Sequence, residues 1–176
     1  EREESSAEVL ADETRIQELA KELVAIDQQN PDDRDSLLRS KSLADLRNEL
    51  ESEIEHLGYL DVGLFSLSGR VVASNRDEVV GRADLPIKKT ALEKVRQGKA
   101  TVTRPFESVF ARKDESGELK SSLPTMLAMA PIKDESGEII AALALLIRPE
   151  VNFTRILSVA RAGKTGETYA FDEEGV

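Results

Sequence analysis

The chain has 176 residues, of which 40% are hydrophobic and 33% charged, and its formal net charge at pH 7 is −10. This composition is typical of a globular protein with one domain or two very small ones, and no apolar run approaches the roughly 18 to 20 residues of a membrane span. Cysteine is absent, which excludes disulfides, thiolate metal sites and cysteine nucleophiles.

The charge is unevenly distributed along the chain. Residues 1–58 carry 17 acidic and 7 basic side chains, whereas residues 59–176 carry 17 of each and hold all seven aromatic residues. The sequence thus predicts a charged N-terminal arm followed by a neutral domain. Because an acidic surface repels phosphate backbones and anionic lipids, nucleic-acid binding is disfavoured.

The arm is predicted to form two amphipathic helices, the first of them long. Apolar residues with heptad-like spacing form its stripe: Val9, Ile16, Leu19, Leu23 and Ile26. The segment 30–36 (NPDDRDS) interrupts the pattern, since Pro disfavours helix at the preceding residue and Asp and Ser are good caps. A second stripe follows and ends before Gly58, a plausible C-terminal cap: Leu43, Leu46, Leu50, Ile54 and Leu57.

The stripe on the first helix has two compatible interpretations. Both helices can pack on the domain that follows them, and the first helix can also pair with its copy in a second chain. The second interpretation predicts a homodimer through the N-terminal helix. Deleting residues 1–30 and measuring the mass in solution would test it.

After residue 58 the sequence alternates between strand-like and turn-like segments. Two strands at 59–65 (YLDVGLF) and 70–75 (RVVASN) are joined by the turn SLSG, and a helix at 87–98 ends on a glycine. Three further strand-like runs are found at 100–112, 125–132 and 138–147. The last two are apolar on both faces, so both faces are expected to be covered.

The hexapeptide KDESGE occurs twice, at 113–118 and 133–138, between predicted strands. Asp and Ser bond to nearby backbone groups and Gly tolerates positive φ, so the motif predicts a turn. An EF-hand calcium loop needs oxygen ligands at alternate positions through 12 residues closed by Glu, and neither copy has this pattern. We interpret both copies as strand connections rather than metal sites.

Three features carry a resemblance to a known family. They are the long N-terminal helix, LFSLSGRVVASN with VVGRADL after it, and APIKDESGEIIAALALLI. In this layout the chain resembles the Cache family of extracytoplasmic sensor domains, which are PAS-like. GKTGETYAFDEEGV at the end resembles the opening of a second, membrane-proximal unit, so the whole protein is similar to a double-Cache sensor. The chain would then be a piece of a longer protein.

The resemblance implies an α+β fold in which a long N-terminal helix accompanies a PAS-like antiparallel sheet of about five strands flanked by helices. It divides the chain into an arm (1–58), a membrane-distal domain (59–160) and the start of a second unit (161–176). It also implies a non-enzymatic, periplasmic or extracellular domain of a membrane-tethered protein, without a cofactor. Such a domain binds a small ligand and relays the signal through helices to a cytoplasmic kinase, cyclase or chemoreceptor module.

One departure from the family and two alternatives bear on this function. The amino-acid-binding subgroup of the family uses a constellation that includes Trp, and this chain has none, so those roles are not carried over. One alternative is a structural or dimerisation module with no ligand of its own. The other is an intracellular PAS-like domain with haem or flavin, for which the chain offers one His and no Cys as axial ligands.

The candidate ligand site lies on the predicted strands. Strand alternation places Arg104 on an otherwise apolar face with Phe106, and Phe110 and Arg112 share that face if the alternation continues past Pro105. Two guanidinium groups among aromatic rings would suit a small carboxylate or another anion. The alternative is that Arg104 reaches a surface acid with its stem along the sheet.

Small side chains on the last two strands either accept a closely packed helix or leave room for a cavity. They share one parity in the sequence: Ala128, Ala130, Ala142 and Ala144. Met126 and Met129 either line such a pocket or fill the core. The candidate ligand-binding residues are therefore Arg104, Phe106, Phe110, Arg112, Met126, Ala128, Met129 and Ala142.

Three further motifs are set aside. RAGKTGE lacks the glycine of a P-loop, because Ser158 occupies that position. His56 is the only histidine, which excludes a His-based metal site, and we expect it to be exposed. Asn152 begins a glycosylation sequon, which matters only in a host that glycosylates such sites.

Overall fold

The computed structural model describes residues 2–31, 33–87, 89–113 and 116–149. The second unit predicted at 161–176 lies outside the described residues, as do RAGKTGE and the sequon at Asn152. All statements about structure below concern the described residues.

The described part of the N-terminal segment forms four helices: α1 (Arg2–Ala11), α2 (Thr14–Gln29), α3 (Arg34–Leu38) and α4 (Lys41–Leu57). The prediction of one long first helix was therefore wrong. The helix stops after Ala11, and Glu13 has an extended backbone with ψ 123°. The break also displaces the stripe, because Val9 is 63% exposed and Leu10 is buried instead.

Helix α4 is formed as its apolar spacing predicts. Leu43, Leu46, Leu50 and Ile54 are all buried along one side. At its start the Ser40 side chain accepts a hydrogen bond from the Leu43 N–H at 3.1 Å. The predicted cap at Gly58 is confirmed: it has φ +75°, a conformation that favours glycine, and its N–H donates to the Ile54 carbonyl.

The second part of the chain forms an antiparallel sheet with the strand order β2-β1-β8-β7-β3, and β4 also pairs with β7. The strands are β1 (Asp61–Ser66), β2 (Val71–Ser74), β3 (Thr101–Val102), β4 (Phe106–Glu107), β7 (Pro124–Lys133) and β8 (Ile139–Ile147). A separate hairpin contains β5 (Arg112–Lys113) and β6 (Leu119–Lys120). This arrangement confirms the predicted α+β, PAS-like fold. The predicted strand 100–112 is instead three short strands with irregular segments between them.

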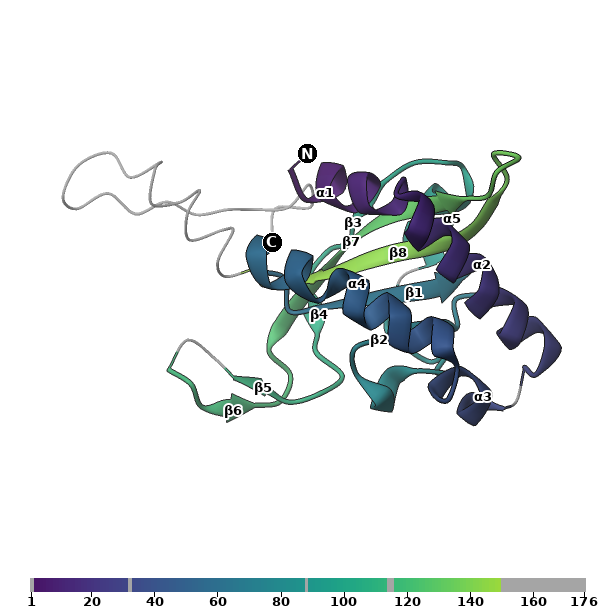
Figure 1. Cartoon of the computed structure of the whole chain (residues 1–176). Coiled ribbons are helices and arrows are strands. Elements are labelled where there is room, and N and C mark those ends of the chain that lie inside the picture. Colours follow the sequence, from purple (N-terminus) through teal and green to yellow (C-terminus); the bar gives the residue numbers. More distant parts are fainter. Residues whose placement is uncertain (1, 32, 88, 114–115, 150–176) are drawn as a thin grey trace.

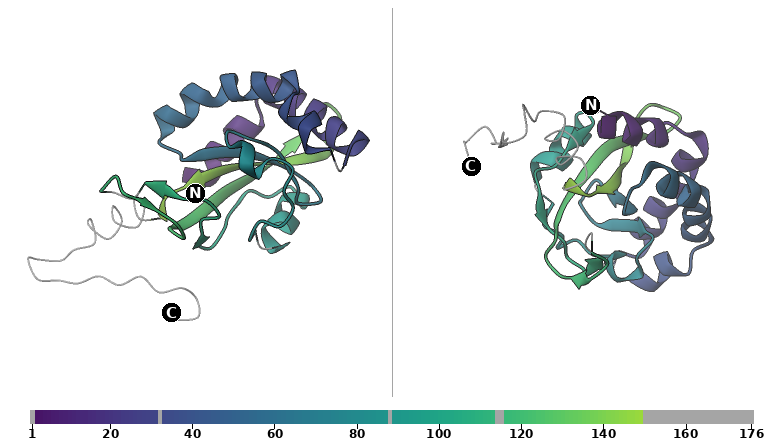
Figure 2. Two further views of the ribbon diagram at one scale, coloured as in Figure 1. Left: turned by 90° about the horizontal axis from the view of Figure 1, so that it is seen from below. Right: turned by 90° about the vertical axis from the view of Figure 1, so that its left-hand side faces the viewer.

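The sheet is covered on both faces. Helices α1, α2 and α4 lie on one face, and the left view of Figure 2 shows this helical layer on the opposite side of the sheet from α5 (Lys89–Arg96). The 3₁₀ helix η1 (Asp77–Val79) follows β2 and precedes α5 along the chain (Figure 1). The helical layer and the sheet share one apolar core, because Leu23 and Leu50 pack in the same cluster as Leu64 and Leu143.

The turn predicted at 133–138 is confirmed between β7 and β8. The Asp134 Oδ1 atom accepts hydrogen bonds from the N–H groups of Ser136 at 2.9 Å and Glu138 at 3.0 Å. Gly137 has φ +85°, which explains the glycine. The other copy, at 113–118, joins β5 to β6, and residues 114–115 lie outside the described part of the chain.

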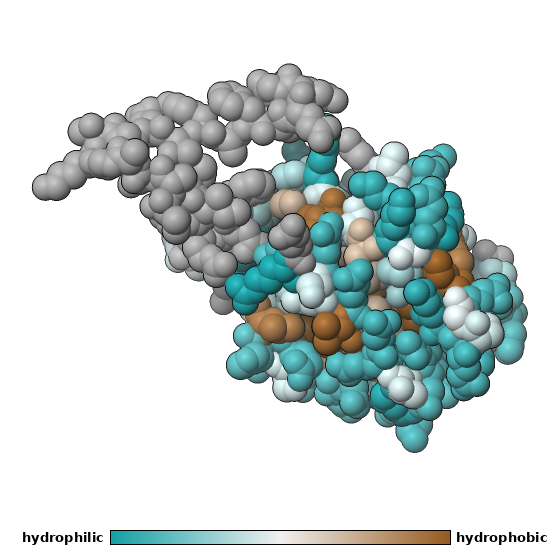
Figure 3. All heavy atoms as spheres, turned by 90° about the horizontal axis from the view of Figure 1, so that it is seen from above, coloured by the Kyte–Doolittle hydropathy of each residue, from teal (hydrophilic) through white to brown (hydrophobic). Residues whose placement is uncertain are grey.

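The apolar stripe of α2 packs against other parts of the same chain. Ile16, Leu19 and Leu23 are buried in the core shared with the sheet. The face seen in Figure 3, on the side of α1, is mostly hydrophilic where it is visible, with apolar residues in small separate areas. A homodimer through α1 stays a prediction, but the buried stripe cannot supply its contacts. In the described part of the chain, no helix combines the length and the apolar character needed to span a bilayer.

Candidate functional site

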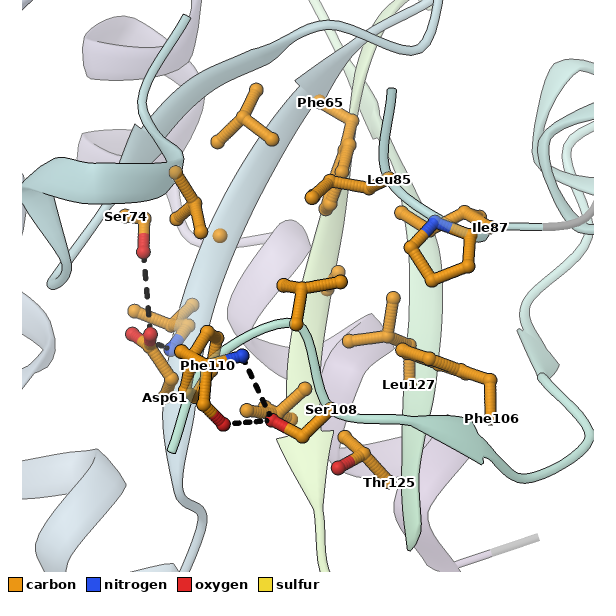
Figure 4. A pocket seen from close by; sticks show the side chains of 18 residues that line it. Asp61, Phe65, Ser74, Leu85, Ile87, Phe106, Ser108, Phe110, Thr125 and Leu127 are labelled. Carbon is orange, nitrogen blue, oxygen red and sulfur yellow. Dashed lines mark hydrogen bonds between the residues drawn. The ribbon is translucent and has the colours of Figure 1, made fainter. Parts of the chain in front are cut away.

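A cavity of about 60 Å³ lies between the sheet and the segment that runs from η1 to β4 and beyond. The sheet contributes its floor with Phe65, Leu127, Ala144 and Leu146, and the covering segment contributes Val79, Leu85, Ile87, Phe106 and Phe110. Four polar residues also line it: Asp61, Ser74, Ser108 and Thr125. In Figure 4, Phe65, Leu85 and Ile87 lie at the end away from Asp61, Ser108 and Thr125.

The cavity exists because two of the smallest residues meet on the sheet floor. Gly63 on β1 pairs directly with Ala144 on β8. Directly opposed residues in adjacent strands share one face of the sheet, so the pair leaves space that larger side chains would fill. The next pair on this face, Phe65 with Ala142, is filled by the ring of Phe65. The local sequence therefore places the space beside β1 and β8 rather than elsewhere on the sheet.

Asp61 holds the polar end of the cavity together. Only 5% of the residue is exposed, and its carboxylate accepts from the Val62 N–H at 2.7 Å and the Ser74 hydroxyl at 3.2 Å. The Asn75 N–H also donates to it at 3.3 Å, and Arg76 Nε lies 3.4 Å from Oδ2. Burial raises the pKa of this carboxyl, and these partners offset only part of that effect.

The guanidinium of Arg76 links Asp61 to the cover of the cavity. Its carbon lies 4.0 Å from the centre of the Phe110 ring, a cation–π contact. Phe110 is itself held by Ser108, whose hydroxyl donates to the Phe110 carbonyl at 2.7 Å. The covering segment is thus attached to the end of β1 through Arg76.

The stability of the protein is expected to depend on pH through Asp61. Its folded pKa lies above the ordinary value of 3.8, so between these two values the folded state binds a proton that the unfolded state lacks. The stabilisation of the folded state by this bound proton is complete below pH 3.8 and is lost as the pH rises through the folded pKa. Urea unfolding across this range should show the stability of the wild type falling relative to Asp61→Asn as the pH rises.

Asp84 is the matched control with the opposite sign. Its pKa is lowered, chiefly by the hydrogen bond from Arg82. The ionised carboxylate therefore stabilises the folded state, and this stabilisation is lost as the pH falls. Asp84→Asn should therefore show the reverse trend relative to the wild type. Parallel trends for the two variants would contradict the raised pKa of Asp61.

The predicted site residues are placed in several different environments. Phe106 and Phe110 line the cavity. Met129 and Ala142 lie in the core on the cavity side of the sheet but do not line the cavity. Arg112 is buried and donates to the Pro124 carbonyl.

The shared parity of the alanines did not place them on one face. Ala128 pairs with Leu145, and Met129 pairs with Ala144. Even-numbered residues of β7 therefore share a face with odd-numbered residues of β8. Ala128 faces the helices, and Met126 has the same parity on β7, whereas Ala142 faces the cavity side.

Arg104 lies at a different place, in a groove of about 410 Å³ between α5 and β3. Its side chain is exposed, as is that of Lys94, which contacts the Thr101 hydroxyl at 3.5 Å. Phe106 borders both this groove and the central cavity. The expected alternation does not hold because β3 ends at Val102 and residues 103–105 are irregular before β4 begins at Phe106.

Several arginines connect the end of β2 to the helical layer. Arg34 Nε on α3 donates to the Val80 carbonyl at 2.9 Å. Arg47 on α4 donates to the Ser74 carbonyl at 2.9 Å and pairs with Asp77 at 2.7 Å. Val79 and Ser74 line the cavity, so the segment that borders the cavity is also the segment that the helices hold.

Most of the cavity residues were missed from the sequence. Asp61 could have been found, because it is a lone acid within the apolar strand YLDVGLF. Gly63 and Ala144 could not, since their meeting depends on strand register. His56 is exposed, as expected. Among the described residues, no cluster of three or more His, Cys, Asp or Glu could hold a metal ion.

No family model matches the sequence, and no curated protein matches it either. Solved structures with a similar fold include the sensor domain of DcuS from E. coli, with 16% identity, 78% of this chain and 94% of that chain covered, and a TM-score of 0.47. Another is the sensor domain of the V. cholerae histidine kinase DctB, with 18% identity, coverage of 72% and 45%, and a TM-score of 0.42.

A third is an extracellular ligand-binding receptor from Desulfohalobium retbaense, with 18% identity, coverage of 80% and 25%, and a TM-score of 0.40. The chain therefore spans nearly all of the DcuS domain but less than half of the other two proteins. All three TM-scores lie below 0.5, and neither a ligand nor an output module follows from them.

Proposed function

We propose that the chain is an extracytoplasmic sensory domain that binds a small molecule in the central cavity and relays its occupancy to a cytoplasmic kinase, cyclase or chemoreceptor module. One observation carries the proposal: an apolar cavity lies at the centre of the sheet, and among the described residues that line it none belongs to an α-helix, so its cover is largely irregular. Such cavities are where small ligands bind in proteins. The Cache-like sequence pattern supports the same role.

The proposed relay runs through the end of β2. A ligand that displaces Val79 or Phe110 would move the segment from Ser74 to Arg82, because Val79 lies within this segment and Arg76 contacts the Phe110 ring. Arg34 and Arg47 hold this segment from α3 and α4. Occupancy of the cavity would therefore change the packing of the helical layer, which is the kind of two-state element that signalling requires.

A thermal-shift screen tests the proposal. Amino acids, amines, carboxylates and uncharged compounds are added to the wild type, to Ala144→Leu, which fills the cavity floor, and to Arg104→Ala, which alters the groove. The expected result is a shift that Ala144→Leu abolishes and Arg104→Ala retains. A shift that disappears only in Arg104→Ala would move the site to the groove and favour the anionic ligand. Silence across the library would contradict ligand binding.

A structural or dimerisation module is the second candidate function. It is favoured by the small volume of the cavity and by the internal pairing of Asp61, both of which are compatible with a core that holds no ligand. This candidate predicts no shift with any compound in the same screen.

A homodimer through the outer side of α1 remains part of the proposal. Val9 is the large apolar residue that α1 exposes, so Val9→Glu should lower the mass in solution from that of a dimer to that of a monomer. Ser5→Glu adds the same charge at another exposed position of α1 and should leave the dimer intact. Light scattering measures both, and a wild type that is monomeric would contradict the interface.

A further inference from the structure

The hydrogen-bond donors at the polar end of the central cavity are committed to the protein itself. The Ser74 hydroxyl donates to Asp61, and the Ser108 hydroxyl donates to the Phe110 carbonyl. The Thr125 hydroxyl donates to the Leu123 carbonyl at 3.2 Å. Each of these hydroxyl groups therefore has its single proton in use, and a ligand that needs a donor would have to break an existing bond.

The carboxylate acceptor of Asp61 is committed in the same way. The carboxylate of Asp61 already faces four donors, namely the groups of Val62, Ser74, Asn75 and Arg76. A carboxylate has about four lone-pair positions, so a cationic ligand would have to displace Arg76. No basic residue is among those that line the cavity in the described part of the chain, so an anion would find no counter-charge there.

Size restricts the ligand further. An engineered cavity of about 150 Å³ in another protein holds benzene or xenon, whereas this cavity measures about 60 Å³. A compact ligand fits without rearrangement. An aromatic ring would require the irregular cover, which includes Leu85 and the exposed Val109, to move outwards.

We propose that the central cavity selects small, uncharged, apolar molecules over amino acids, amines and carboxylates. This inference rests on the proposed sensory function and names its ligand class. A polar group that is buried without a hydrogen-bond partner loses the free energy of its hydration and gains no bond in its place. An unpaired charge loses far more hydration free energy. Contacts with the apolar wall are the interactions that the cavity offers to an incoming molecule.

Nuclear magnetic resonance of methyl-labelled protein tests the ligand class. Xenon, benzene, benzoate and benzylamine are titrated separately into the intact chain. Xenon and benzene are expected to shift the methyl signals of Val79, Leu85 and Leu127 in a saturable way. Benzoate and benzylamine should bind there at least about tenfold more weakly than benzene, because each would bury a charge.

Variants assign the response to the cavity. Ala144→Leu should abolish the shifts, and Gly63→Ala should weaken them and serves as a milder variant, since its new Cβ would meet the nearest atoms at 3.4 Å. Ala91→Leu makes the same change as the first variant beside the groove and should leave the shifts intact. Thr125→Val removes a hydroxyl at nearly constant shape, and xenon binding should survive it.

The outcomes separate the ligand class from the function. If benzoate or benzylamine binds in the cavity as tightly as benzene, the apolar class is wrong and the sensory proposal stands. If xenon and benzene leave the methyl signals unchanged, the apolar class is overturned, and the thermal-shift screen decides the sensory proposal independently. Loss of xenon binding in Thr125→Val would also overturn the class, because binding would then depend on more than the apolar wall.

Discussion

Replacing Leu50 with Ala is expected to lower the free energy of unfolding by roughly 2 to 5 kcal/mol. Leu50 lies on α4 and is fully buried in the core that α2, α4 and the sheet share. The substitution removes three carbon atoms and leaves a cavity between two layers that cannot easily close. Urea denaturation of the two proteins, monitored by circular dichroism, measures the difference.

Leu119→Ala provides the matched control. Leu119 lies on β6 and is 66% exposed, so the same chemical change should alter stability by less than about 0.5 kcal/mol. An equally small effect at Leu50 would contradict a shared core and would make the helices an independent arm.

Replacing Asp27 with Ala is expected to cost about 3 kcal/mol, because it leaves the half-buried Arg70 without its partner. Asp27 Oδ1 lies 2.8 Å from Arg70 Nε, and the two side chains are only 10% and 19% exposed. The pair joins α2 to the residue that precedes β2. Chemical denaturation again gives the change in stability.

The double variant Asp27→Leu with Arg70→Met removes both charges and keeps apolar side chains at both positions. Because the cost of the single change comes from the stranded charge, removing both charges should restore most of the stability. The exposed pair of Asp35 and Arg39, at 59% and 79% exposure, is the control, and Asp35→Ala should cost less than about 1 kcal/mol. A double variant as unstable as Asp27→Ala would contradict this explanation.

The parts of the fold that local chemistry determines could be predicted from the sequence. The stripe of α4 and its cap at Gly58 were readable, as was the turn at 133–138, because helix periodicity and turn residues act over a few positions. The break between α1 and α2 was missed. Its sequence, Asp12 followed by Glu13, contains neither Pro nor Gly, so no local signal marks it.

The site was harder to predict because it depends on register and on irregular backbone. One step in the pairing of β7 with β8 decides whether Ala128 or Ala142 faces the cavity, and no residue in either strand fixes that step alone. The strand that was expected to carry Arg104 and Phe106 together ends at Val102, and residues 103–105 are irregular. Strand alternation still singled out Phe106 and Phe110, and both line the cavity.

A crystal structure of the domain with the compound that gives the largest thermal shift tests the central claim most directly. The sensory account predicts new electron density between Phe110, Leu127 and Ala144, together with a displacement of the segment from Ser74 to Arg82. Density in the groove beside Lys94 and Arg104, with the central cavity unchanged, would contradict the claim that the central cavity is the ligand site.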